Sequence, residues 1–195
     1  AGRVRGRSTK LFNSGVRDFL GGNAVASSNV RYGTDGIIRF SNLRMTAPLL
    51  RVTSGEGSYN PDGRVQLSAR ANSTEYGPVG VELAGTITNP RATVTAARPG
   101  LGIGLANLVA RITGAKNGYR LAATGETDYG PLSADVVLLM ASGPMTIDIE
   151  RGDLSGTGFN GRLVRSDAGP FVGQLNASGQ GLGGLVRLSA AGKYQ

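Results

Sequence analysis

The chain has 195 residues, a formal net charge of +8 at pH 7 and 39% hydrophobic residues, so it is long enough to bury a core and too apolar to be wholly disordered. It contains no cysteine, which excludes disulfides, zinc–thiolate sites and thiol nucleophiles. It also contains no histidine, the usual general base near neutral pH and the commonest metal ligand, so hydrolytic and redox chemistry are disfavoured.

The positive charge raises the question of a nucleic-acid partner. The arginines are dispersed along the chain, and the one basic cluster comprises Arg3, Arg5, Arg7 and Lys10. No aromatic residues are interleaved with them, as a single-strand binder requires. We therefore expect no nucleic-acid partner and assign the charge to a solvated polar face or to attraction toward anionic lipid headgroups.

The sequence has no run of about eighteen apolar residues, so we expect no membrane-spanning helix. No signal-peptide pattern is present. The chain opens on a basic stretch and closes at residues 191–195 without a terminating signal, and we expect a fragment of a longer protein.

At the N-terminus, residues 1–8 read as the end of a strand and residues 9–20 as a short helix. Ser8 or Thr9 supplies an N-cap and Gly21-Gly22 a stop. The apolar residues that share one helical face are Leu11, Phe12, Val16, Phe19 and Leu20. We expect this helix to pack on a sheet or cap its end, with a lid or membrane-surface helix as the alternative.

From about residue 25 to the end, the pattern predicts strands. Gly33-Thr34-Asp35-Gly36 and Asn60-Pro61-Asp62-Gly63 are turn signals. After the second turn, Val65, Leu67 and the alanines at 69 and 71 alternate with polar residues, as in a half-buried strand. Residues 105–113, helical by propensity, are also assigned to a strand because their apolar residues alternate.

The long strand recurs after a similar corner. The corners are Tyr76-Gly77-Pro78, Tyr129-Gly130-Pro131 and, more loosely, Ala168-Gly169-Pro170, and an alternating strand follows each. The Gly-rich stretch 99–105 lacks the spacing of a phosphate loop and reads as another corner. Repeats of this kind share one continuous apolar face, because no single unit can bury its own.

The acidic residues define no site. Asp148 and Glu150 share one strand face, as do Glu126 and Asp128, but calcium needs six or more oxygen ligands. No G-x-S-x-G motif is present, and no histidine exists to activate a serine. We therefore expect no catalytic residues, no metal, no cofactor and no enzymatic activity.

Several segments in order carry a resemblance over roughly residues 40–195. They are residues 43–48 (LRMTAP), 59–64 (YNPDGR), 76–78 (YGP), 97–102 (ARPGLG), 128–131 (DYGP), 169–171 (GPF) and 179–188. This stretch is similar to the interior of TamB-like proteins, large members of the AsmA-like family of bacterial envelope proteins.

The resemblance implies a mainly β fold, in which long strands form a folded-over, taco-like or solenoid-like trough with an apolar interior. Such proteins sit in the periplasm of Gram-negative bacteria, anchored in the inner membrane by an N-terminal helix that this sequence lacks. They move phospholipid to the outer membrane and assist translocation and assembly of outer-membrane proteins beside a barrel partner. The family's C-terminal partner-binding region is not identifiable here, and we treat residues 1–195 as one β-rich segment.

Phospholipid acyl chains are the ligand that the resemblance implies, and small residues at Ala69, Ala71, Gly161 and Gly173 would leave room for them. The pattern leaves open whether the apolar faces form a groove or close into a core. The residues expected to line the face in either case are Val65, Leu67, Val81, Leu83, Leu132, Val136, Leu138, Met140, Ile147, Ile149, Leu163, Phe171, Leu175 and Leu188.

Two other architectures fit the alternation. A structural β-solenoid or adhesin-type scaffold would close its apolar interior and bind a partner through its polar outer face. An outer-membrane barrel would turn the apolar residues to lipid, but such barrels carry aromatic girdles, and the aromatics here amount to only 6%. An enzyme is the least favoured class.

Overall fold

A computed structural model describes residues 2–8, 23–74, 76–86, 88–100, 103–115, 117–139, 144–165, 171–179 and 182–188. These residues are mainly β and include no helix, which confirms the predicted class. The helix predicted over residues 9–20 lies outside the described residues. Among those residues, no helix is long and apolar enough to cross a membrane.

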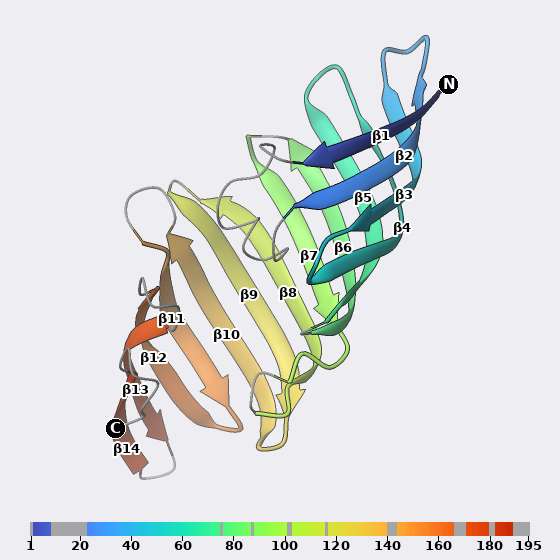
Figure 1. Ribbon diagram of the computed structural model, residues 1–195. Coiled ribbons are helices and arrows are strands. Elements are labelled where there is room, and N and C mark those ends of the chain that lie inside the picture. The colour runs from blue at the N-terminus through green and yellow to red at the C-terminus, as the bar shows by residue number, and fades with distance from the viewer. Residues whose placement is uncertain are drawn as a thin grey trace. The chain divides into compact units, whose positions relative to one another are not determined.

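The chain divides into two compact units, residues 1–100 and 101–195, and the sequence prediction placed no boundary near residue 100. In each unit the strands pair antiparallel with their sequence neighbours, in chain order (Figure 1). The first unit contains β1 (Gly2–Ser8), β2 (Ala24–Tyr32), β3 (Ile38–Thr46), β4 (Leu50–Tyr59), β5 (Arg64–Ser73), β6 (Gly77–Thr86) and β7 (Pro90–Ala96). The second contains β8 (Ala106–Ala115), β9 (Gly118–Thr127), β10 (Gly130–Leu139), β11 (Thr146–Leu154), β12 (Thr157–Arg165), β13 (Phe171–Gly179) and β14 (Leu182–Leu188).

Short turns join the strands where Gly, Asn and Asp were predicted to punctuate the chain. In the β2–β3 turn, Gly33 N–H donates to the Ile37 carbonyl at 2.9 Å and Gly36 adopts φ 74°. In the β4–β5 turn, Gly63 N–H donates to the Asn60 carbonyl at 2.9 Å with φ 84°. Glycine suits both positions because it reaches positive φ without a steric penalty. These turn predictions are confirmed.

The Tyr-Gly-Pro corners are confirmed at two of the predicted places. Gly77 begins β6 with φ 69° and Gly130 begins β10 with φ 114°. In the second corner Thr127 Oγ1 donates to the Gly130 carbonyl at 2.8 Å and accepts from Tyr129 N–H at 3.1 Å. The looser corner at 168–170 lies outside the described residues. The strand predicted over 105–113 is confirmed as β8.

Bulges shift the alternation in several strands. In β3, Asn42 has φ 52°, and two residues there oppose one residue of β2. This bulge lets Phe40 and Leu43, three apart in sequence, contact the same face of β4 at Gly57 and Gly55. A similar bulge occurs at Asn107 in β8, where φ is 51°. Bulges increase the twist of a sheet, and Figure 1 shows the strand direction turning progressively from β7 to β1 within the first unit.

The described strands of each unit form a single layer. Their extensive contacts are all between strands consecutive in sequence. No large side chain among the described residues is fully buried, and the buried hydrophobic residues are mostly small: Ala24, Ala47, Val52, Ala71, Ala96, Leu105 and Ala110. One face of each sheet is therefore apolar and only half-buried by its own strand neighbours.

Candidate functional site

The apolar face of the first unit runs in register across its strands. Leu67 of β5 lies opposite Leu83 of β6, which lies opposite Ala92 of β7. The next row places Ala69, Val81 and Val94 side by side. Most of these side chains are half-buried, as are Val65 and its strand neighbours on the same face. The predicted lining residues of this unit, Val65, Leu67, Val81 and Leu83, thus share one face.

The second unit has an apolar face of the same kind. One row contains Ile112, Leu121, Val136, Ile149, Gly161 and Leu175 in register. A second row contains Tyr119, Leu138, Ile147, Leu163 and Gly173, and a third contains Gly125, Leu132 and Leu154. The structure therefore brings together most of the predicted lining residues of this unit.

The remaining predicted lining residues of the second unit are Phe171, Leu188 and Met140. The backbone of Phe171 pairs with Arg165, and that of Leu188 pairs with Gly173, which puts both residues within the sheet of the second unit. Met140 lies outside the described residues.

Glycines interrupt both apolar faces, and large side chains of neighbouring strands lie over several of them. The Phe40 ring lies where a Cβ of Gly57 would stand, and the Phe159 ring occupies the same place at Gly152. Leu105 similarly approaches a Cβ at Gly125 to 2.8 Å. These glycine–aromatic pairs were missed in the sequence because the partners lie on different strands and only the register joins them.

Gly161 and Gly173 have a different role from the one predicted. A Cβ at Gly161 would overlap the Gln174 carbonyl oxygen, and one at Gly173 would overlap the Arg162 carbonyl oxygen. Both glycines are required by the close backbone approach of β12 and β13. The interpretation that they leave room for acyl chains is therefore not supported at these two positions.

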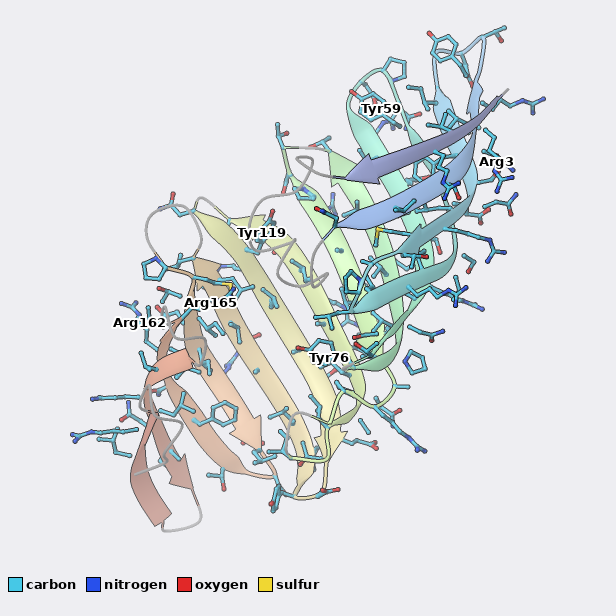
Figure 2. All side chains as sticks on the ribbon, viewed as in Figure 1. Arg3, Tyr59, Tyr76, Tyr119, Arg162 and Arg165 are labelled. Carbon is cyan, nitrogen blue, oxygen red and sulfur yellow. The ribbon has the colours of Figure 1, made fainter. Side chains whose placement is uncertain are left out.

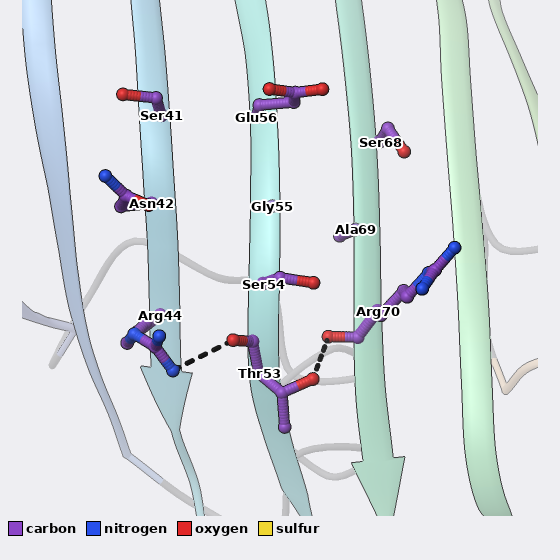
Figure 3. A pocket seen from close by; sticks show the side chains of 10 residues that line it. All are labelled: Ser41, Asn42, Arg44, Thr53, Ser54, Gly55, Glu56, Ser68, Ala69 and Arg70. Carbon is purple, nitrogen blue, oxygen red and sulfur yellow. Dashed lines mark hydrogen bonds between the residues drawn. The ribbon is translucent and has the colours of Figure 1, made fainter.

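In the first unit, a polar seam opens between β3 and β4 on the polar face, opposite the apolar one. The ladder pairs Phe40 with Gly57 and Met45 with Val52 and is interrupted between those pairs. A hollow of about 360 Å³ lies there (Figure 3), lined by Ser41, Asn42, Arg44, Thr53, Ser54, Gly55, Glu56, Ser68, Ala69 and Arg70. Arg44 Nη1 donates to the Thr53 carbonyl at 2.9 Å, satisfying an acceptor that the broken ladder exposes (Figure 3). The sequence prediction did not find this seam.

On the polar face of the second unit, ion pairs join neighbouring and next-neighbouring strands. Arg120 pairs with Glu150 at 3.0 Å, and Arg151 pairs with Asp135 at 2.9 Å. Arg162 pairs with Asp148. Asp148 and Glu150, considered in the sequence as a weak ligand pair, are thus each held by a different arginine. Among the described residues, no group of three or more acidic side chains is arranged to hold a metal ion.

Each ion pair among the described residues of the first unit joins a turn aspartate to the start of the strand that follows the turn. Arg39 Nη2 and Asp35 Oδ2 are 2.7 Å apart, and Arg64 Nε and Asp62 Oδ2 are also 2.7 Å apart. The hydrogen bond from Arg39, with a smaller contribution from the Ile37 N–H, lowers the pKa of Asp35 below its ordinary value of 3.8. The N–H of Arg64 is the main cause of the lowered pKa of Asp62.

Removing the guanidinium with Arg39→Gln is expected to raise the pKa of Asp35 toward 3.8 and leave the lowered pKa of Asp62 unchanged. Because a lowered folded-state pKa favours the ionised form, the stabilisation by Asp35 is present at neutral pH and lost as the pH falls through that pKa. Carboxyl-carbon NMR titration of both aspartates measures this. An Asp35 pKa that does not move would show that the turn backbone alone holds the carboxylate.

The geometry defines a class of protein: mainly β, with two antiparallel units whose strands carry an apolar face and a polar face, and with no cluster of metal-binding side chains among the described residues. No protein-family model, curated protein or solved structure matches this chain.

Proposed function

We propose that this chain is a segment of a TamB-like periplasmic bridge protein, whose strands fold over into an apolar trough that carries phospholipid acyl chains from the inner toward the outer membrane. In this proposal the intact protein is anchored in the inner membrane of a Gram-negative bacterium. It works beside an outer-membrane barrel partner and also assists assembly of outer-membrane proteins. The chain has no enzymatic role.

The observation that carries the proposal is the pair of apolar faces, continuous in register over consecutive strands. Binding stabilises an acyl chain by about 0.8 kcal/mol for each methylene removed from water. Its binding site must therefore be a long apolar surface rather than a small pocket. Rows such as Leu121, Val136 and Ile149 supply that surface without polar atoms. Half-buried side chains leave apolar area for a ligand to cover, whereas an ordinary core would bury them fully.

Solvent extraction and mass spectrometry of the chain, purified without detergent from a bacterial envelope, test the proposal. The expected result is phospholipid at a reproducible molar ratio. Protein that is folded and free of lipid would contradict an open trough and favour the scaffold described next.

The second candidate is a non-catalytic structural β-solenoid or adhesin-type scaffold with a closed apolar core. It is favoured by the way Phe40 and Phe159 fill the space over Gly57 and Gly152, since such filling is typical of packed interiors. A closed core predicts full protection of the apolar side chains from a lipid-soluble quencher or label, whereas a trough predicts access.

A further inference from the structure

The polar face of the first unit is crowded with arginines. The register places residues of β1 to β7 on this face in rows, for example Arg31 opposite Arg39, and Arg5 opposite Ser27 and then Arg44. The arginines on it are all exposed: Arg3, Arg5, Arg31, Arg39, Arg44, Arg51, Arg64, Arg70 and Arg91. We call this surface the arginine face. Figure 2 shows Arg3 among nitrogen-tipped side chains that project from one side of β1 to β4.

Among the described residues, carboxylates neutralise only two members of the arginine face. The described acidic residues of this unit are Asp35, Glu56, Asp62 and Glu82, of which the two aspartates, both in turns, pair with Arg39 and Arg64. Glu82 instead accepts a hydrogen bond from Ser68 Oγ at 2.7 Å. Among the described residues, no ion pair joins two strands of this unit, in contrast to the three such pairs of the second unit: Arg120–Glu150, Arg151–Asp135 and Arg162–Asp148.

Most arginines of this face have no carboxylate partner among the described residues, and their mutual repulsion is unfavourable within the protein. Arg31 of β2 lies directly opposite Arg39 of β3, a like-charge contact that destabilises a sheet and that Asp35 relieves only at Arg39. The second unit shows that the same fold accommodates cross-strand carboxylates. The excess charge of the first unit is therefore available to an anionic surface outside the protein.

We propose that the arginine face docks on the surface of a bilayer rich in anionic phospholipid, with the guanidinium groups on headgroup phosphates. Guanidinium matches phosphate as a bidentate donor, and anionic lipids attract each nearby basic residue by about 1 kcal/mol. The seam between β3 and β4 adds the hydroxyls of Ser41 and Ser54 beside Arg44 and Arg70, which are further donors for headgroup oxygens.

A lipid surface fits this face better than nucleic acid. The arginines are spread over six strands, β1 to β5 and β7, rather than along one groove, and mobile lipids can gather beneath scattered charges. The residues between them in the rows include Ser, Thr, Asn, Gln and Glu, and none of those described is an aromatic side chain on which a base would stack. The docking requires only the outer polar face and does not depend on the acyl trough proposed above.

Co-sedimentation of the full chain with vesicles at 150 mM salt tests the proposal. Vesicles of phosphatidylcholine alone are compared with vesicles containing phosphatidylglycerol at 30 mol %. The first variant replaces Arg51, Arg70 and Arg91 with serine; none of these side chains has a carboxylate partner among the described residues. The control replaces Arg111, Arg120 and Arg151 of the second unit with serine and removes the same charge.

The expected result is binding to the anionic vesicles alone, weakened about 100-fold by the first variant, since each arginine contributes about fivefold. The control should lose less than about threefold, because it leaves every residue of the arginine face in place. Equal losses in the two variants would overturn the arginine face in favour of net charge.

Equal binding to neutral vesicles would also overturn the proposal, as would duplex DNA that displaces the chain from anionic vesicles at equal phosphate concentration. Circular dichroism confirms that each variant keeps its strand content. Phospholipid recovered by solvent extraction reports on the trough separately, so failure of the vesicle experiment leaves that measurement independent.

Discussion

Leu83→Asp and Leu138→Asp are expected to lower the phospholipid recovered with the protein about tenfold while leaving its strand content unchanged. Each side chain lies in the middle of an apolar row, Leu83 between Leu67 and Ala92, and Leu138 between Tyr119 and Ile147. A carboxylate there removes dry contact with about two methylenes, which are worth about 0.8 kcal/mol each. Extraction and quantitative mass spectrometry of the purified variants measure the loss.

Ala84→Asp is the matched control for Leu83→Asp. Ala84 is the next residue of β6, points to the opposite face and is exposed, with Gln66 and Arg91 as its cross-strand neighbours. Its lipid content should equal that of the unchanged protein. If Leu83→Asp and Leu138→Asp instead unfold the protein, the new carboxylates are buried in a closed core, where an unpaired charge is strongly destabilising. That result would favour the scaffold over the trough.

The alternation of β5 shows what sequence periodicity could predict. Its odd-numbered residues from Val65 to Ala71 are half-buried or buried, while Arg64, Gln66 and Arg70 are exposed. The period of two fixes the face of each residue once the strand is straight. Turn signals such as Asn60-Pro61-Asp62-Gly63 then set the ends of the strand, so strand and corner were both within reach of the sequence.

The bulges could not be predicted in the same way. Phe40 and Leu43 are an odd number of residues apart, so a period of two assigns them to opposite faces. The left-handed conformation of Asn42 restores them to one face, and asparagine is only one of several residues that tolerate it. The seam between β3 and β4 follows from that local geometry, and the pairing of Gly57 with Phe40 follows from the register. Neither the seam nor this contact can be predicted from the sequence of one strand alone.

The contrast between the two polar faces also depends on register. Asp135 and Arg151 are sixteen residues apart, and their side chains meet only because β10 and β11 pair at those positions. Composition reports the sum of all charges and hides the fact that one unit pairs them across strands and the other does not. The total of +8 was therefore interpreted as a dispersed charge, although the structure gathers many of its arginines on one face.

Gly152→Val in β11 is expected to lower the free energy of unfolding by about 2–3 kcal/mol, because its side chain would enter the space of the Phe159 ring. Gly152 is buried and pairs directly with Phe159 of β12. Urea unfolding followed by far-ultraviolet circular dichroism measures the change, since the chain has no tryptophan. Gly158→Ala is the control: a Cβ there would stand 3.5 Å from the nearest atom, the Ser178 carbonyl oxygen, so stability should be unchanged or raised by up to about 1 kcal/mol.

A double-mutant cycle tests whether the ring itself causes the loss. In a Phe159→Ala background the valine at position 152 would enter vacated space, so the combined cost should fall short of the sum of the single costs by at least about 1 kcal/mol. Additive costs would mean that the backbone of β11, rather than the ring, requires glycine. Coupling would establish that a cross-strand aromatic fills this part of the apolar face, which limits any ligand to the rows on either side of it.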